Sequence, residues 1–230
     1  MKRFDRCARR AQRRVAGLLI AAAVLGLTAA GCGGGSDNGQ EPVNPAEEHT
    51  AEGWRQFEMG DYGAAQLAFE EALECDSLHA EAWSGRGWAH LRLGERAQAR
   101  QDLEKCLSLD ADHWDAVVGL AVVVASLGEE EVAIDLCLEI LGSVGDGYRF
   151  SHDADVTGAD LRILLAASYF RTLQFDLALE QVRALDPGLT LDPTNPETWG
   201  EHATFEAALL SEIEGLALSS ATLGLTVPMG

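Results

Sequence analysis

The stretch AEAWSGRGWAHLRLGERAQARQDLEKCLSLDADH, residues 80–113, decides the fold of this chain. Its apolar and small residues recur at helical spacing, the pattern breaks at Gly94, and it then resumes as far as Leu107. This predicts two helices joined by a short turn, in which the glycine is free to take the positive φ that ends the first helix. A unit of this size cannot bury its apolar face alone, so neighbouring copies are expected.

The same pattern returns on both sides with a 34-residue period, because Gly60 and Gly128 stand equally far before and after Gly94. Two antiparallel helices approach closely only where Gly or Ala lies at the crossing, and a bulky column opposite fills the adjoining gap. The small columns are Gly53/Gly87 and Ala65/Ala99/Ala133, and the larger ones are Phe69/Leu103/Cys137 and Leu73/Leu107/Leu141. They predict helix–turn–helix units at 46–79, 80–113, 114–147 and 159–190, with an insertion at 143–158.

These columns resemble those of the tetratricopeptide repeat family, which Ala80-Glu81-Ala82-Trp83 followed by Gly87, Gly94, Ala99 and Cys106 matches best. The proline that closes the family's repeat is replaced by Ser77 and Ala111. The resemblance implies an all-α solenoid of about four repeats over residues 46–216. Asn195-Pro196-Glu197 predicts the start of a capping helix at 196–216, followed by a tail at 217–230.

Residues 1–31 have a different composition from the rest of the chain. They hold seven basic residues and one acid, and the apolar run Val15–Ala30 is too short for a spanning helix. Leu27-Thr28-Ala29-Ala30-Gly31-Cys32 resembles a bacterial lipobox, with Ala29 where Leu is usual. The resemblance implies cleavage between Gly31 and Cys32 and a lipid on Cys32. An ordinary secretory signal and an uncleaved anchor helix are the alternatives.

The residues after Cys32 support a lipoprotein. Residues 32–45 are rich in Gly, Ser and Pro and suit a flexible tether between a lipid and a folded domain. Gly33 directly after the cysteine resembles the outer-membrane sorting signal of Gram-negative bacteria. We therefore expect a lipid-anchored protein of the bacterial cell envelope, at the outer membrane and facing the periplasm.

The whole chain carries 17 Lys and Arg against 37 Asp and Glu, a net charge of −20. From residue 32 onward there are 10 basic and 36 acidic residues, a net charge of −26. This balance excludes a nucleic-acid binder that works by neutralising phosphates. It favours a partner with basic residues beside its apolar contacts, drawn in by a long-range field.

The first helices of such units build the concave face of a solenoid. Trp54 and Trp88 recur there at the 34-residue period, and large apolar residues follow three positions later. Because Trp and Arg dominate binding hot spots, this face predicts an open groove with an aromatic ladder for an extended or helical peptide. The alternative is that the Trp residues pack on the N-terminal segment or between units. The predicted groove residues are Trp54, Phe57, Trp88, Leu91, Arg92, Phe170 and Arg171.

Little else in the sequence indicates chemistry. Cys75, Cys106 and Cys137 recur at a shorter interval than the repeat and are expected to be small buried side chains, although an envelope location permits a disulfide. His152, Asp153 and Asp155 of the insertion resemble metal ligands, but no second ligand pair lies nearby, which favours a polar loop with two docked aromatics. No nucleophile, Walker or dinucleotide motif occurs. We therefore predict no catalytic, cofactor or metal site.

Two functions fit these observations. The first is a membrane-tethered scaffold that binds another envelope protein, or a peptide segment of one, in the concave groove. The alternative is a pilotin-like or outer-membrane assembly lipoprotein that delivers a pilus, secretion or barrel subunit. An enzyme is not expected, because nothing supplies a nucleophile, an acid–base pair or a cofactor loop.

Overall fold

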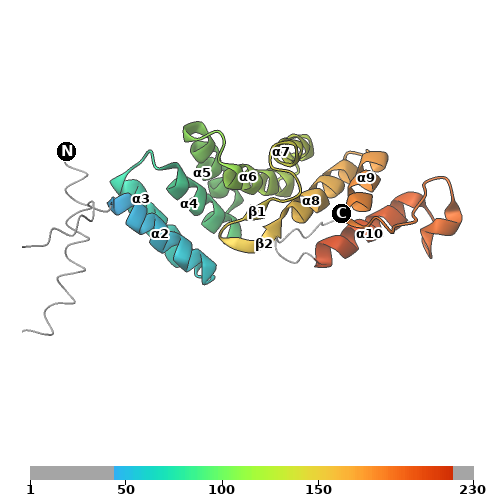
Figure 1. Cartoon of the computed structure of the whole chain (residues 1–230), viewed down its shortest axis with the longest axis horizontal. Coiled ribbons are helices and arrows are strands. Elements are labelled where there is room, and N and C mark those ends of the chain that lie inside the picture. The colour runs from blue at the N-terminus through green and yellow to red at the C-terminus, as the bar shows by residue number, and fades with distance from the viewer. Residues whose placement is uncertain (1–43, 220–230) are drawn as a thin grey trace, which may run out of the picture.

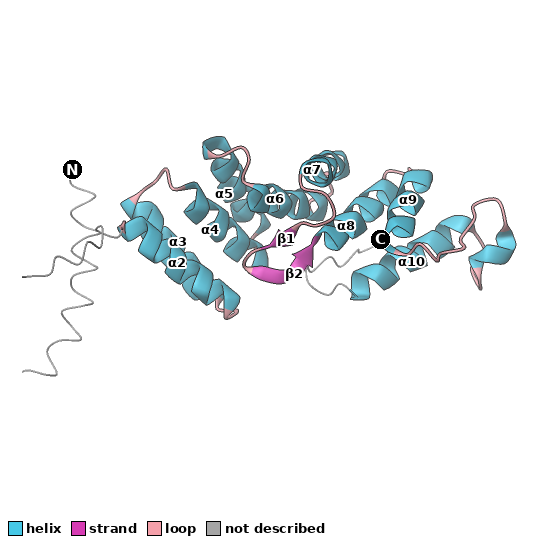
Figure 2. Ribbon diagram, in the orientation of Figure 1, coloured by secondary structure: helices cyan, strands magenta, loops and turns pink. Residues whose placement is uncertain are grey.

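The computed structural model describes residues 44–219, and helices stacked side by side form an elongated solenoid over this range (Figures 1 and 2). The predicted signal peptide, Cys32 and residues 220–230 lie outside the described residues. Each unit is an antiparallel helix pair, which confirms the all-α solenoid of four repeats. The pairs are α2 (Pro45–Glu58) with α3 (Tyr62–Cys75), α4 (Ala80–Arg92) with α5 (Arg96–Leu109), α6 (Trp114–Ser126) with α7 (Glu130–Ser143), and α8 (Gly158–Arg171) with α9 (Phe175–Leu185).

The helices cross closely where the sequence places glycine. A Cβ atom on Gly53 would lie 2.6 Å from the ring of Phe69, and one on Gly85 would lie closer still to that ring. A Cβ on Gly87 would lie 2.7 Å from Cγ of Leu103. Phe69 and Leu103 are fully buried. The predicted packing of a small column against a bulky one is confirmed, and this packing fixes the distance between neighbouring helices.

The turns within the first three units have the predicted geometry. Gly60, Gly94 and Gly128 have φ values of 79°, 79° and 80°, which a residue with a side chain adopts only at a cost. In the fourth unit Leu173 holds the corresponding place with a φ of 61° and is 73% exposed. A leucine in this conformation carries roughly 1–2 kcal/mol of backbone strain.

The insertion between α7 and α8 forms an antiparallel hairpin of β1 (Arg149–Phe150) and β2 (Asp153–Thr157). Figure 2 shows the two strands below α6 and next to α8. Its two aromatic side chains are buried, Tyr148 at 5% exposure and Phe150 at 1%. The prediction that two aromatics of the insertion dock on the array is confirmed.

The C-terminal segment differs from the predicted single helix at 196–216. Asn195 does act as an N-cap, accepting from the backbone N–H of Glu197 at 3.1 Å, but it caps only the short 3-10 helix η1 (Pro196–Trp199). Gly200, at a φ of 63°, ends η1, and the chain then turns into α10 (Phe205–Ser219). Helix α10 packs on α8 and α9 and buries apolar side chains, so this segment covers the last repeat even though its helix begins later than predicted.

The cysteines of the second helices are buried, as predicted. Cys106 and Cys137 are free thiols with no exposed surface. Cys75 is 6% exposed and is disulfide-bonded, so the expectation of a merely buried thiol is wrong at this position. Burial raises the pKa of both Cys106 and Cys137 to about 12. Their thiols therefore stay protonated at neutral pH and serve as packing groups.

The close crossing at Gly87 is testable with a matched pair of substitutions. Gly87→Ala should lower the free energy of unfolding by about 1–3 kcal/mol, because the new methyl group overlaps Leu103. Gly142→Ala in α7, where a Cβ meets nothing within 4 Å, should instead raise it by about 0.5–1 kcal/mol. Urea unfolding of both variants measures these changes. Equal stability of the two variants would contradict the crossing.

Candidate interaction groove

The two predicted groove tryptophans connect successive repeats. The indole Nε1 of Trp54 on α2 donates to Oε1 of Glu81 on α4 at 2.6 Å. Nε1 of Trp88 on α4 donates to the backbone oxygen of Asp115 on α6 at 2.9 Å. The two donors are one repeat period apart in the sequence, and so are the two acceptor residues, although Glu81 accepts with its side chain and Asp115 with its backbone oxygen. Each tryptophan therefore joins its repeat to the start of the next one.

The hairpin covers these tryptophans. The ring of Phe150 stacks on Trp88 with centroids 4.4 Å apart, and its edge meets Trp54 at 5.8 Å and Phe57 at 6.2 Å. Trp54, Phe57 and Trp88 are only 5%, 3% and 0% exposed. The prediction that they line an open groove is wrong, because the insertion folds back onto the face built by α2, α4 and α6. We call this face of α2, α4 and α6 the groove, and the hairpin of the same chain covers it.

The tip of the hairpin also makes polar contacts with the groove. His152 stacks flat on Trp54 with centroids 3.8 Å apart, and its Nδ1 lies 3.0 Å from Oε1 of Glu58. Asp153 forms an ion pair with Arg92, with both side chains about one-fifth exposed. These contacts join residues 61 and 94 positions apart in the sequence. A segment that follows the third repeat thus binds the first two.

Behind the tip, Tyr148 secures the hairpin to the third repeat. Its hydroxyl donates to Oδ1 of Asp115 at 2.7 Å. Burial and the neighbouring Asp115 raise the pKa of Tyr148 well above its usual range, so the hydroxyl remains a donor at all physiological pH values. Asp115 therefore contacts both Tyr148 and Trp88.

The remaining predicted groove residues are distributed along the solenoid. Leu91 is partly buried against the core. Phe170 and Arg171 lie at the end of α8. The ring of Phe170 packs against that of Phe175 with centroids 5.1 Å apart, and Arg171 donates to Oε1 of Glu130 at 3.0 Å. The structure thus brings Trp54, Phe57, Trp88 and Arg92 together around the hairpin and leaves Phe170 and Arg171 outside that cluster.

Sequence reasoning missed that the insertion completes the groove. Phe150, His152 and Asp153 were visible as an aromatic, a histidine and an acid within a polar segment. The sequence feature that pointed to this packing was the presence of aromatic residues in an insertion that interrupts a regular repeat, because large aromatic side chains are usually buried.

Glu81 and His113 form a second junction between repeats. Oε2 of Glu81 lies 2.8 Å from Nε2 of His113, the residue that caps α6. Burial acts to raise the pKa of Glu81, but hydrogen bonds from His113 and Trp54 and the charge of His113 outweigh it and hold this pKa below 4.5. Burial acts to lower the pKa of His113, and the bond and charge of Glu81 outweigh it and hold that pKa above 6.5.

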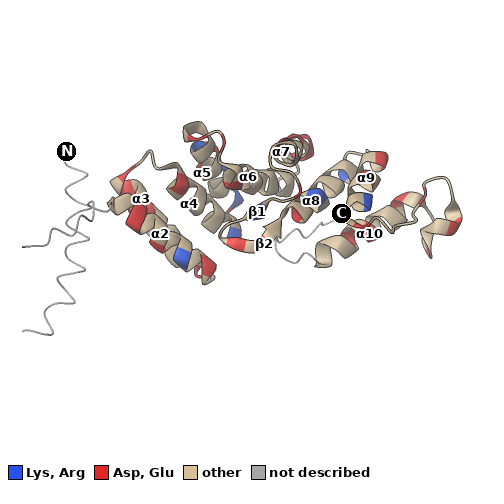
Figure 3. Ribbon diagram, viewed as in Figure 1, with Lys and Arg blue, Asp and Glu red and all other residues tan. Residues whose placement is uncertain are grey.

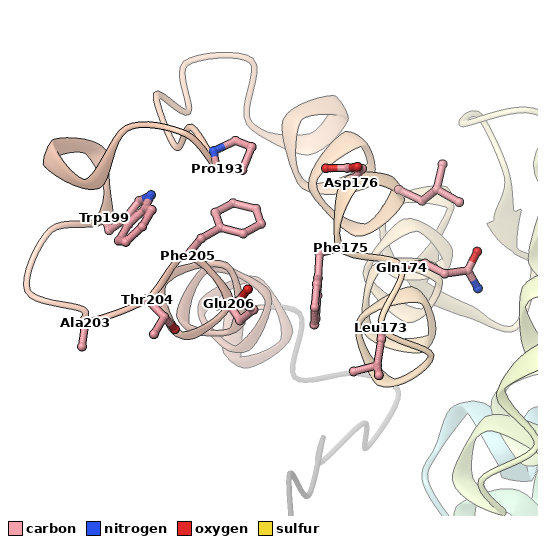
Figure 4. A pocket seen from close by; sticks show the side chains of 11 residues that line it. Leu173, Gln174, Phe175, Asp176, Pro193, Trp199, Ala203, Thr204, Phe205 and Glu206 are labelled. Atoms are coloured by element: carbon pink, nitrogen blue, oxygen red, sulfur yellow. The ribbon is translucent and has the colours of Figure 1, made fainter.

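Two pockets lie beside these elements. One, of about 510 Å³, opens next to His152 and is bordered by Trp54, Glu58, His79 and Glu81. The other, of about 670 Å³, lies between the turn at Leu173 and the start of α10, where Figure 4 shows several aromatic side chains around it. Across residues 44–219, no three His, Cys, Asp or Glu side chains are grouped to hold a metal ion.

Acidic side chains occur on most helices of the solenoid, with few Lys and Arg between them (Figure 3). Arg92 is therefore a local positive group in an acidic surrounding. Of the helices in the part that the structure describes, none has the length and apolar content to cross a membrane.

Comparison with known proteins gives the class. The tetratricopeptide repeat model matches residues 50–105 and 87–148, so tetratricopeptide repeats make up this part of the chain. No curated protein matches the sequence. Tetratricopeptide repeats are typically protein–protein interaction modules.

Solved structures share this fold at low sequence identity. MamA is 18% identical with a TM-score of 0.51, covering 76% of this chain and 82% of its own. YrrB, a tetratricopeptide protein with an unusual peptide-binding site, is 17% identical with a TM-score of 0.54, covering 77% and 89%. The pilF protein of Pseudomonas aeruginosa is 16% identical with a TM-score of 0.52, covering 77% and 74%.

The Glu81–His113 pair predicts a pH-dependent stability. The pKa of His113 is raised on folding, so protonation of this side chain adds to the free energy of unfolding. This contribution is complete below about pH 6.5 and disappears as the pH rises through the pKa of His113 in the folded protein. The contribution of Glu81 disappears at the other end, as pH falls through its lowered pKa. The stability difference between the parent and His113→Gln should therefore shrink as the pH rises from below 6.5 through the raised pKa of His113.

Urea unfolding at a series of pH values measures this difference. His202→Gln is the matched control, because His202 is exposed. A difference between parent and His113→Gln that stays constant over this range would show that the pair is not coupled to protonation.

Proposed function

We propose that the protein is a membrane-tethered interaction scaffold of the bacterial cell envelope, which binds a segment of another envelope protein in the groove formed by α2, α4 and α6. The observation that carries the proposal is the groove itself. It holds the tip of a β-hairpin through an aromatic cluster and an arginine, which are the groups that dominate protein–protein hot spots.

The tether rests on the order of features before the described domain. A basic head, a short apolar run, the lipobox-like stretch ending at Cys32 and a Gly/Ser/Pro-rich segment follow one another directly. A diacylglyceryl group on Cys32 would hold the repeat domain at a membrane through a flexible linker. Gly33 favours the outer membrane and a domain that faces the periplasm.

The tether is tested by replacing the cysteine. Cys32→Ser, expressed in a Gram-negative host, should leave the membrane fraction and fail to incorporate labelled palmitate, because the acylated thiol is gone. Cys7→Ser is the matched control and should keep both properties, since Cys7 lies in the part removed by cleavage. Membrane retention of Cys32→Ser together with an unlabelled parent protein would refute the lipid anchor.

A second experiment tests the scaffold and its alternative. The tagged full chain is cross-linked in cells and purified from solubilised membranes, and its partners are identified by mass spectrometry. We expect specific envelope proteins that are absent with an Arg92→Ala variant, which removes the partly exposed arginine of the groove and leaves the buried tryptophans in place. A single abundant pilus, secretion or barrel subunit would favour an assembly factor. Recovery of no partner from either form would refute the scaffold.

A further inference from the structure

We infer that residues Phe150–Asp153 act as an internal ligand of the groove, and that the partner segment displaces them with the same chemistry. That segment carries an aromatic residue followed three positions later by Asp or Glu. The inference rests on the proposed scaffold function and specifies what the groove recognises.

Contacts with the groove hold the hairpin in its position. Its strands contain two and five residues, and their pairing is irregular between Arg149 and Phe150. An isolated two-stranded hairpin is marginally stable in water. The tip therefore holds its conformation because Phe150, His152 and Asp153 contact α2 and α4, as a short peptide holds its conformation when bound.

The contacts of the tip are those of a bound peptide. Phe150 is the apolar anchor, enclosed by Trp54, Phe57 and Trp88 and only 1% exposed. Asp153 is the charged anchor, paired with Arg92. Of the two residues between them, His152 stacks on the face of Trp54. An aromatic side chain and a carboxylate three positions apart thus satisfy the groove.

The base of the insertion has separate contacts, so the tip can leave while the base stays. Arg162 of α8 donates to both carboxylate oxygens of Asp146, at 2.6 and 2.9 Å. The backbone N–H of Gly158 donates to the oxygen of Tyr148 at 3.0 Å. None of these bonds involves the tip.

A tethered ligand lowers the apparent affinity of any competitor. A short tether gives an effective concentration of roughly millimolar. If the tip occupies the groove about 90–99% of the time, a free segment of equal intrinsic affinity binds about 10- to 100-fold more weakly than to an empty groove. The acidic body then favours partners whose flanking residues are basic.

The test uses a synthetic peptide of residues 149–155, RFSHDAD, with a fluorescent label at its N-terminus. It is titrated into the intact chain and into the double variant Phe150→Ala/Asp153→Ala, whose tip lacks both anchors while the groove is unchanged. Fluorescence anisotropy measures Kd, and circular dichroism checks folding. The double variant should bind the peptide at least about 10-fold more tightly than the intact chain.

Matched arginines separate recognition from general electrostatics. In the double-variant background, Arg92→Ala should weaken peptide binding at least about 5-fold, because it removes the partner of the peptide's acid. Arg171→Ala should leave binding unchanged, since Arg171 pairs with Glu130 instead. A peptide with alanine in place of its phenylalanine should not bind.

A folded double variant that binds the peptide no better than the intact chain would overturn the inference. If that variant does not fold, amide exchange on the intact chain decides. Amides of the β1–β2 ladder should exchange at a lower opening free energy than those of α6; exchange of both together would show a permanent core element and refute a displaceable ligand. Either negative result would refute the internal ligand alone, and the proposed scaffold function would still hold if cross-linking recovers a partner.

Discussion

The contact between the ring of Phe69 and the glycines at positions 53 and 85 sets the spacing of the first repeats, and the contact of Leu103 with Gly87 continues it. A bulky side chain on the second helix of a unit fits only because the facing helices carry no Cβ there. With this spacing fixed from one repeat to the next, Trp54 and Trp88 fall on the same face, and each indole N–H donates to an equivalent residue of the next repeat. The groove is thus a consequence of the repeat packing.

The insertion uses a surface that the repeats had already built. Regular stacking leaves Trp54, Phe57 and Trp88 as a large apolar surface, and burying one phenylalanine against it stabilises the folded chain by about 2–3 kcal/mol. Phe150 supplies that side chain, while Arg92 and Asp153 set the direction of the tip. The hairpin thereby removes this apolar surface from water.

The acidic composition has a structural role at the junctions between repeats. Glu81, in the first turn of α4, accepts from Trp54 and pairs with His113 at the start of α6, so one carboxylate connects three successive units. A negative charge at a helix N-terminus is also stabilised by the helix dipole. The remaining carboxylates lie on the surface, where they set the long-range field that a partner meets.

The sequence by itself determined the repeat, its four units, the glycine turns and the pairing of small with bulky columns, because these features depend on residues at a fixed spacing and on local sterics. It also placed Trp54, Phe57, Trp88 and Arg92 on one face, but as part of an open groove that included Leu91, Phe170 and Arg171. Only the tertiary structure decided that Phe150 and His152 cover that face, that Phe170 and Arg171 lie apart from it, and that the cap begins at Phe205. Those outcomes depend on where an irregular segment returns in space, and contacts between residues 61 to 94 positions apart leave no periodic pattern in the sequence.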